Sequence, residues 1–354
     1  MKKVQEVLNH IFIDGLSAMA QGLFATLIIG TIIQQIGLFV GGDIGNLVVL
    51  TGKVAAALTG AGIGVAVAAK FGKPMLVVIS TASAGMVGAF ASSILSGKIL
   101  SEGVIVLAGP GEPLGAFIAA YVGLVVGGLV AGRTKVDIII TPIVTISSGA
   151  AMGLLIGPGI SKFMAWLGSL INWGTEQQPL LMGIIVSVLM GMILTLPISS
   201  AAIGIILNLS GIAAGAATVG CCCNMIGFAV ASYRENKLGG LLAQGIGTSM
   251  LQVPNIVKKP VIWLPAILSS AILGPVGTML FQMSSNATGS GMGTAGLVGP
   301  IMVYQTMIKS TPSSTVLITI VVLLFVLPAV ITLLLTEGMR KLGWIKSGDM
   351  ALNL

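Results

Sequence analysis

Two long stretches of this chain, residues 177–233 and 260–308, contain no aspartate, glutamate, lysine or arginine. A helix crosses the hydrocarbon core of a membrane with about 20 apolar residues. Each stretch therefore holds more membrane-embedded chain than one crossing requires. Because lipid offers no hydrogen bonds to peptide groups, the extra chain has to be helical or shielded inside the protein. These stretches restrict the fold to a membrane protein in which some segments enter the bilayer without simply crossing it.

The composition excludes an ordinary soluble domain. Hydrophobic residues make up 55% of the 354 residues and charged residues only 8%, whereas about a quarter of a soluble protein is charged. The fifty glycines agree with this, because membrane helices use glycine for close packing. The net charge of +7 comes from lysines and arginines scattered singly or in pairs. That pattern is typical of loops facing an anionic cytoplasmic leaflet and does not indicate a nucleic-acid partner.

The charges also mark where single crossings begin and end. Six intervals have the length of one crossing: 14–43, 53–70, 73–98, 112–133, 137–162 and 309–337. If the basic residues around Arg234 and Lys259 are cytoplasmic, each long uncharged stretch holds one crossing and one re-entrant hairpin, which gives eight spans. If residues 238–257 form a further span, the total is ten. We therefore expect an all-α polytopic membrane protein with about 8–10 transmembrane helices and both termini in the cytoplasm.

The N-terminal segment, Met1 to Asp14, predicts a helix lying on the membrane surface. Its apolar residues recur at helical spacing, and its mixed charges exclude a secretory signal peptide. We expect an N-terminal membrane half over residues 1–179, composed of this interfacial helix, five spans and an amphipathic linker at 158–179. The C-terminal membrane half covers residues 180–354 and contains both predicted hairpins.

The two re-entrant hairpins are predicted near residues 195–210 and 284–305. The second contains the uncharged sequence SSNATGSGMGTAGLVGP, which is rich in glycine and hydroxyl groups. Such irregular backbone persists at membrane depth only where it is buried in protein or lines a wet cavity. The first hairpin follows Pro197 and, like the second, places a pair of serines and an asparagine in the membrane. The two segments together predict a transport site.

Three motifs resemble the EIIC permeases of the phosphotransferase system. They are LAGPGEPLGAF at Leu107 to Phe117, TLPISSAAI at Thr195 to Ile203, and KLGGLLAQGIGTSMLQVPNI at Lys237 to Ile256. The order of elements over most of the chain is similar to the stand-alone branch of that family. This branch contains sugar-permease IIC subunits and PfoR-type regulators.

The resemblance implies a homodimer that carries a sugar-like solute by an elevator-type movement of the hairpin-bearing half. It also implies EIIA- and EIIB-type partner proteins. This chain carries no fused phosphoryl-carrying domain and no exposed cysteine, so phosphorylation would require those separate proteins. The sugar-carrying members typically use an intramembrane histidine and glutamate, whereas the only histidine here is His10, which lies outside the predicted spans.

Glu112 is the most prominent acidic candidate for solute binding. It lies between two prolines and two glycines, and its carboxylate could accept sugar hydroxyls or bind a coupling proton. The alternative is a surface loop outside the membrane, because Gly-Pro pairs are common in loops. Lys53 could neutralise Glu112 if it is buried, or extend to the lipid headgroups if it is not.

The remaining candidates are uncharged hydroxyl and amide side chains that suit recognition of a polyhydroxylated solute. Each of them could instead form hydrogen bonds between helices. The predicted substrate-binding residues, in addition to Glu112, are Ser199, Ser200, Asn208, Asn224, Gln244, Ser285, Asn286 and Thr288.

No metal, nucleotide or other cofactor is expected. Cys221, Cys222 and Cys223 are consecutive, so on a helix their side chains point about 100° apart and do not converge on one ion. They are interpreted as small packing residues. The GAGIG sequence around Gly62 has no flanking βαβ unit to make it a dinucleotide site.

The sequence thus predicts a transporter for a small polar organic solute, such as a sugar or polyol, in a bacterial plasma membrane. The alternative is a membrane sensor or regulator that retains a permease fold and signals ligand occupancy. An enzyme is not expected, because the sequence shows no paired acid and base, metal cluster or activated nucleophile.

Overall fold

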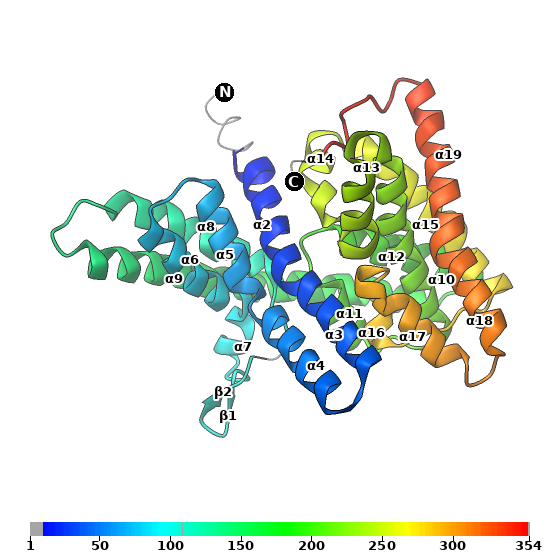
Figure 1. The fold of residues 1–354 in the computed structure, drawn as a ribbon, viewed down its shortest axis with the longest axis horizontal. Coiled ribbons are helices and arrows are strands. Elements are labelled where there is room, and N and C mark those ends of the chain that lie inside the picture. Colours follow the sequence, from blue (N-terminus) through cyan, green and yellow to red (C-terminus); the bar gives the residue numbers. More distant parts are fainter. Residues whose placement is uncertain (1–9, 108, 353–354) are drawn as a thin grey trace. The chain divides into compact units, whose positions relative to one another are not determined.

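The computed structural model describes residues 10–107 and 109–352, and it is almost entirely helical (Figure 1). Most of the predicted interfacial helix at Met1 to Asp14 lies outside the described residues. The chain forms two compact units, Met1–Met164 and Ala165–Leu354, which we describe separately. The division into membrane halves at 1–179 and 180–354 stays a prediction.

Six helices in the described part of the chain are long and apolar enough to cross a membrane. They cover Ile13–Val40, Pro113–Val130, Asp137–Thr175, Gly211–Ala231, Pro260–Leu280 and Ser313–Lys341. A seventh span is formed if Gly42–Ala57 and Thr59–Lys70, which meet at a bend of 50°, are counted together. Met75–Ala89 and Pro179–Thr195 are shorter apolar helices, so the predicted total of 8–10 depends on whether they count. The predicted class of all-α polytopic membrane protein is confirmed.

The first unit is a series of helices joined by short turns. In chain order it contains α2 (Leu16–Leu23), α3 (Ile29–Val40), α4 (Gly42–Ala57), α5 (Thr59–Lys70), α6 (Met75–Ala89), α7 (Ala91–Leu95), β1 (Leu100–Ser101), β2 (Val104–Ile105) and α8 (Pro113–Val130). A π-helical turn at Phe24–Ile28 joins α2 to α3. Gly41 ends α3 with a φ of 66°, a conformation that costs glycine little. Pro74 and Pro113 mark the starts of α6 and α8, as expected of a residue that fixes φ and lacks an N–H.

Glycines bring the helices of this unit into backbone contact, as the sequence predicts. A Cβ added to Gly52 would lie 2.5 Å from the carbonyl oxygen of Gly30, where α3 packs on α4. A Cβ on Gly60 would lie 2.8 Å from the carbonyl oxygen of Gly85, where α5 packs on α6. Gly132 does not pack against another helix: it has a φ of 73° and, among the described residues, no neighbour within 4 Å of an added Cβ. It therefore serves the turn after α8.

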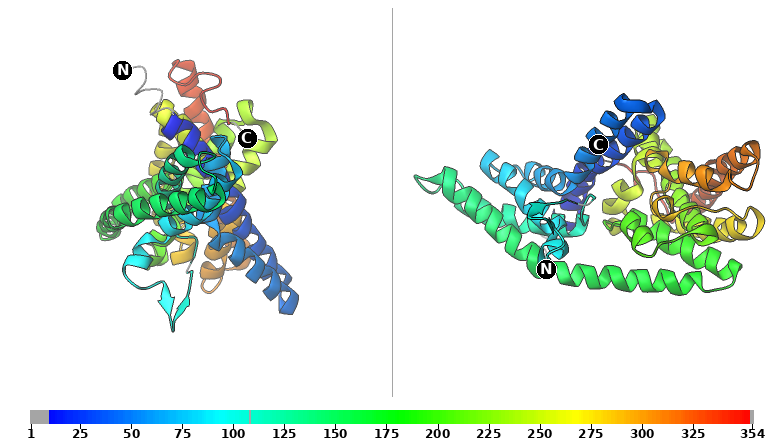
Figure 2. Two further views of the ribbon diagram at one scale, coloured as in Figure 1. Left: turned by 90° about the vertical axis from the view of Figure 1, so that its left-hand side faces the viewer. Right: turned by 90° about the horizontal axis from the view of Figure 1, so that it is seen from below.

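The longest helix is α9, which runs without a break from Asp137 to Thr175 (Figure 2). It contains Pro142 and Pro158. At 1.5 Å per residue its length of 39 residues corresponds to about 58 Å, well beyond one crossing. The predicted linker at 158–179 is thus continuous with the preceding span as far as Thr175.

The second unit is built around α12 (Gly211–Ala231), which is the most completely buried of the span helices. Its small residues let α10 (Pro179–Thr195), α15 (Leu264–Pro275) and α19 (Leu327–Lys341) pack against it. The apolar core includes Val219, Cys222, Cys223, Leu273, Met283, Leu323 and Leu324. The remaining elements are α11 (Ser200–Ile206), α13 (Tyr233–Leu242), η3 (Ala243–Gly247), η4 (Ser249–Gln252), α14 (Val253–Lys258), η5 (Pro260–Trp263), η6 (Val276–Leu280), α16 (Ala287–Ser290), η7 (Ala295–Leu297), α17 (Val298–Met307), α18 (Ser313–Ile320) and η8 (Val321–Val326).

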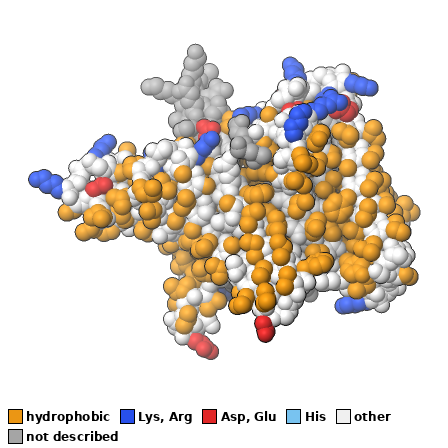
Figure 3. Space-filling model, viewed as in Figure 1, with side chains coloured by type: hydrophobic (Ala, Val, Ile, Leu, Met, Phe, Trp, Pro, Cys, Tyr) orange, Lys and Arg blue, Asp and Glu red, His pale blue; other side chains and the backbone are white. Residues whose placement is uncertain are grey.

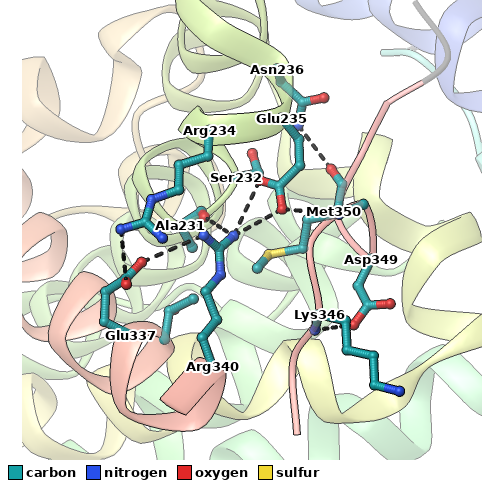
Figure 4. A network of polar contacts seen from close by, with 12 residues as sticks. Ala231, Ser232, Arg234, Glu235, Asn236, Glu337, Arg340, Lys346, Asp349 and Met350 are labelled. Atoms are coloured by element: carbon teal, nitrogen blue, oxygen red, sulfur yellow. Dashed lines mark hydrogen bonds and ion pairs between the residues drawn. The ribbon is translucent and has the colours of Figure 1, made fainter. Parts of the chain in front are cut away.

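One end of the second unit is charged and the middle is apolar. Figure 3 shows hydrophobic side chains over the middle and lysines and arginines gathered at the end that carries α13 and α14. There, Arg340 at the end of α19 pairs with Glu235 at 2.9 Å, and both side chains are largely buried. Arg234 pairs with Glu337 at 3.0 Å (Figure 4). This end fits the predicted cytoplasmic side.

The last described residues, 342–352, fold back across this charged end, and we call them the C-terminal strap. Ile345 and Met350 are buried. The Asn236 side chain donates to the Met350 carbonyl at 2.8 Å (Figure 4). It also accepts from the Leu352 N–H at 2.8 Å. Lys259 pairs with Asp349 at 2.5 Å. The strap thereby fastens the polar ends of several helices to one another.

Candidate functional site

The first broken segment of the second unit covers residues 179–210. Helices α10 and α12 run in the same direction, because Ser187 lies against Gly220 and, further along both helices, Gly191 lies against Asn224. The chain must therefore reverse between them. It turns at residues 196–199, and α11 forms the returning limb, with the Ser199 hydroxyl accepting from the Ala202 N–H at its start.

The second broken segment covers residues 281–307. Its backbone is broken up to Leu297, where α16 has only four residues and Gly293, Gly296 and Leu297 all have positive φ, and the segment then ends in the ten-residue helix α17. Ser285 donates its N–H to the carbonyl of Gly211 at 3.1 Å, which ties the start of this segment to the start of α12. The unwound backbone predicted for residues 284–300 is thus present, and it holds only short helical turns.

The third broken segment covers residues 233–258, and it enters and leaves at the charged end. Asn236 near its start binds the carbonyl of Met350, and Asn255 near its end binds the carbonyl of Ala351, at 2.8 and 2.9 Å. Two side chains that bind adjacent residues of the strap cannot lie on opposite sides of a membrane. The alternative that residues 238–257 form a separate span is therefore wrong.

The three broken segments meet, and three buried hydrogen bonds join them in pairs. Ser200 donates to the carbonyl of Gly291 at 2.6 Å, which links the first segment to the second. Thr195 and Ser249 share a hydrogen bond of 2.8 Å, which links the first to the third. Thr294 donates to the carbonyl of Gly245 at 2.5 Å, which links the second to the third. We call this meeting point the convergence.

Asn224 lies beside the convergence and is completely buried. Its side-chain oxygen accepts from the Trp263 indole N–H at 2.9 Å and from Thr195 at 3.2 Å. Its nitrogen donates to the Gly220 carbonyl at 3.1 Å and to Ser270 at 3.3 Å. These four bonds use the full capacity of an amide. In this conformation Asn224 therefore holds helices together and has no bond to spare for a solute.

Gln244 is also buried, and protein groups bind both its nitrogen and its oxygen. Its nitrogen donates to Ser232 at 2.8 Å and to the Gly240 carbonyl at 2.9 Å, while its oxygen accepts from Gln252 at 2.9 Å. Gln252 in turn donates to the Met350 carbonyl at 3.0 Å. This chain of amides connects the third segment to the strap.

The other predicted residues of the second unit are spread along the broken segments. Ser285 is buried, and its hydroxyl has no hydrogen-bond partner among the described residues. Asn286 caps α16 by accepting from the Gly289 N–H at 2.9 Å, and it also contacts the Met302 sulfur. Asn208, with a φ of 48°, and Thr288 are exposed. Only Ser200 of the predicted residues makes one of the three joining bonds.

Glu112 and Lys53 belong to the first unit. Glu112 immediately precedes α8, and its N–H donates to the Ala89 carbonyl at 2.8 Å. Its participation in one site with residues of the second unit stays a prediction. Lys53 is exposed on α4, so the interpretation of a side chain extending to the headgroups fits and a buried counter-ion does not.

Sequence reasoning does not single out Thr195, Thr294 or Trp263, although all three take part in the bonds at the convergence. Isolated threonines are frequent in membrane helices, and nothing in the local sequence separates these from others. The three cysteines are buried and free, and Cys222 and Cys223 pack in the apolar core. The described residues contain no group of three or more His, Cys, Asp or Glu side chains that could hold a metal ion.

Comparison with known proteins identifies the family. The family model for the EIIC component of the phosphotransferase system matches residues 13–352, which is nearly the whole chain. No curated protein and no solved structure matches it. EIIC is the membrane-embedded sugar permease of that system and works with EIIA and EIIB, which carry the phosphoryl group. The broken helices, the apolar spans and this match together place the chain in the EIIC family of the phosphotransferase system.

Proposed function

We propose that this EIIC protein carries a neutral sugar or polyol across the membrane by alternating access, with the convergence at the centre of its moving part. The observation that carries the proposal is the meeting of three broken segments through Ser200, Ser249 and Thr294. Broken helices at membrane depth expose backbone groups and short polar side chains where an unbroken helix would present none. Such groups can exchange protein hydrogen bonds for bonds to a solute.

The neutrality of the solute follows from the side chains that these segments offer. Residues 177–233 and 260–308 are uncharged, so the first two segments supply only hydroxyls, amides and peptide groups. Burying a charged solute against them would cost several kcal/mol without a counter-charge. Sugar hydroxyls both donate and accept, as serine, threonine and amide groups do. Glu112 would add an acidic acceptor if the first unit contributes to the site.

The arrangement supports an elevator-type mechanism with a closed state. The three joining bonds hold the segments together, Asn224 is saturated by protein partners, and Gln244 is bound through both its nitrogen and its oxygen. Admitting a solute therefore requires these segments to separate, with their bonds transferred to its hydroxyls. We propose that this separation occurs while the second unit moves as a body and the first unit remains as the scaffold.

We further propose how the permease is arranged in the membrane and which proteins it binds. The predicted hairpins near residues 195–210 and 284–305 are re-entrant, and both termini lie in the cytoplasm of a bacterial cell. The protein works as a homodimer with EIIA- and EIIB-type proteins at its charged end. The cluster of basic residues there supports this orientation by the positive-inside rule.

The sensor alternative is favoured by one observation, the strap. Gln252 connects the Met350 carbonyl to Gln244, within the same segment that meets the hairpin tips. A solute that displaces this segment would therefore move a soluble part of the chain. Such a movement could be read by another protein without any transport.

Uptake by the purified protein tests the proposal. Proteoliposomes containing only this chain should accumulate a labelled neutral sugar or hexitol down its concentration gradient, and EIIB and EIIA should convert this exchange into net phosphorylating uptake. The measurement is repeated with a proton or sodium gradient to identify coupling. If the protein binds a sugar but takes it up under none of these conditions, the result contradicts the permease function and supports the sensor function.

A further inference from the structure

A pocket of about 560 Å³ opens in the second unit, away from the convergence. It lies between the start of α12 at Gly211, the turn at Gln282 and Ser284, the end of α17 at Thr306, and α18 at Thr315. Its volume is within the roughly 300–1,000 Å³ typical of small-molecule sites. None of the residues predicted from the sequence lines it, and neither do the residues that form the three joining bonds.

The chemistry of the pocket is that of a neutral polyhydroxylated ligand. Among the described residues, no charged side chain lines it, whereas hydroxyl and amide groups lie on most of its elements. The apolar remainder comes from residues such as Ile212, Phe281 and Met307. Sugars present hydroxyls at their rims and C–H groups on their faces, so they match a wall of this mixed kind. An anion would find no counter-charge here.

Several of these polar groups are free to bind a ligand. Within residues 10–107 and 109–352, the side chains of Gln282, Thr311 and Thr315 form no hydrogen bond to protein. Other threonines within the helices have a partner: the hydroxyls of Thr218 and Thr336, for example, bind carbonyls one turn earlier. Thr315 is in the first turn of α18 and Thr311 precedes that helix, so neither has such a carbonyl.

The backbone at the pocket is also held in an unfavourable conformation. Gln282 has a φ of 43°, a region that side chains other than glycine rarely adopt. Gly211, which also lines the pocket, has a φ of 58°, a conformation that costs glycine little. The hydrogen bond between Ser285 and Gly211 holds the two chains together beside the pocket. A strained position such as Gln282 is more frequent at binding sites than elsewhere.

Two helices place the pocket at the end opposite the strap. Helix α12 begins at Gly211 in the pocket and ends at Ala231, whose carbonyl accepts from Arg340 at 3.0 Å. The span that starts at Ser313 carries Thr315 in its first turn and ends at Lys341. Both spans therefore run from the pocket to the charged end. With the charged end in the cytoplasm, the pocket opens outside.

We propose that this pocket is an entry site that binds a neutral saccharide or polyol on the outer face before the solute reaches the convergence. The inference rests on the proposed function, since the solute class is the same. It adds a second binding site, whose ligands include the side chains of Gln282, Thr311 and Thr315.

Thiol labelling tests the site, and the three native cysteines are buried and need not be removed. Thr311→Cys and Thr315→Cys are placed in right-side-out vesicles and treated with a membrane-impermeant maleimide, in the presence of individual hexoses, disaccharides and hexitols. Ser314→Cys is the matched control, because Ser314 is exposed on the same helix but does not line the pocket. Ser347→Cys reports the opposite end.

The expected result is that Thr311→Cys and Thr315→Cys are labelled from outside and Ser347→Cys is not. One of the saccharides or hexitols should slow labelling at the two pocket positions to about a tenth at about ten times its dissociation constant, with Ser314→Cys unchanged. Uptake is measured in the same vesicles. If a solute is taken up but protects neither cysteine from labelling, the entry site is contradicted and the permease function is not. If a solute protects the two cysteines but is not taken up, the entry site is supported and the permease function is contradicted. If no solute protects the cysteines and none is taken up, the entry site is contradicted as well.

Discussion

The hydroxyl of Ser200 donates a hydrogen bond to the carbonyl of Gly291, 2.6 Å away, and both groups lie at turns of broken membrane segments that are far apart in the sequence. The added Cβ of an alanine at position 291 would collide with the Ser200 backbone. The two turns therefore touch through backbone as well as through the serine side chain. This contact defines where the two hairpins close on each other.

Replacing Ser200 by alanine should weaken that closure. The change leaves the Gly291 carbonyl without its donor in a buried place, and hydrogen bonds between membrane helices contribute about 0.6–2 kcal/mol. We expect a lower melting temperature in detergent and faster hydrogen exchange of residues 287–297. Ser210→Ala is the control, because Ser210 is exposed at the other end of the first segment. Equal exchange in both variants would show that the bond does not hold the turns together.

Asn224→Leu should be more damaging than any change at an exposed amide. It removes the acceptor of the partly buried Trp263 indole N–H and the donor to the buried Gly220 carbonyl. Buried polar groups left without partners cost about 1–3 kcal/mol each. Asn208→Leu, at an exposed position, serves as the control. Size-exclusion chromatography after mild heating should show loss of the Asn224→Leu protein first, and identical survival would count against the network.

Gly220→Ala tests the close approach of α10 and α12. The added methyl group would meet the carbonyl of Ser187 at less than van der Waals distance, so the helices would have to move apart. Overpacking of this kind costs about 1–3 kcal/mol. Gly239→Ala has open space around its Cβ and should be neutral or slightly stabilising. The two variants are compared by thermal unfolding, and a Gly220→Ala protein as stable as Gly239→Ala would refute the packing.

The strap should loosen in acid because of Asp349. Burial raises the pKa of its carboxyl, but hydrogen bonds from Lys259 and the Lys346 N–H, with the charges of both lysines, outweigh burial and lower the pKa overall. A lowered folded-state pKa means that the stabilisation is complete above the usual carboxyl pKa of about 3.9 and is lost as the pH falls through the folded-state value.

Protease cleavage of residues 342–352 should therefore accelerate below about pH 4 in the wild type. Asp349→Asn should be cleaved faster at neutral pH and should show much less acceleration in acid. If both proteins respond to pH identically, Asp349 does not fasten the strap.

The sequence is a good guide to the spans because charges are costly in lipid. The interval ending at Arg133 contains one span helix, the interval ending at Glu337 contains most of another, and the interval from Lys259 to Lys309 contains a span followed by a broken segment. The unwound stretch around Gly293 is also predictable, since glycine and serine weaken helices. These features are local consequences of composition.

The convergence is less predictable because it depends on tertiary contacts. Asn224 and Ser200 are both polar residues in apolar surroundings, yet one is saturated within the helices and the other joins two segments. Their sequence contexts do not distinguish these roles. The third segment is ambiguous for a similar reason: whether residues 238–257 cross or return is decided by the strap, which is remote in sequence.

Sugar uptake by the Thr294→Val protein tests the central claim most directly. The substitution keeps the shape of the side chain and removes its hydrogen bond to Gly245, where two of the three broken segments meet. Thr336→Val, at a buried hydroxyl that binds only the Thr332 carbonyl of its own helix and does not line the outer pocket, is the control. In proteoliposomes, neutral-sugar uptake should change by about tenfold for a loss of roughly 1.4 kcal/mol at the convergence, and the control should transport like the wild type. Equal uptake by all three proteins would contradict a role for the convergence in transport.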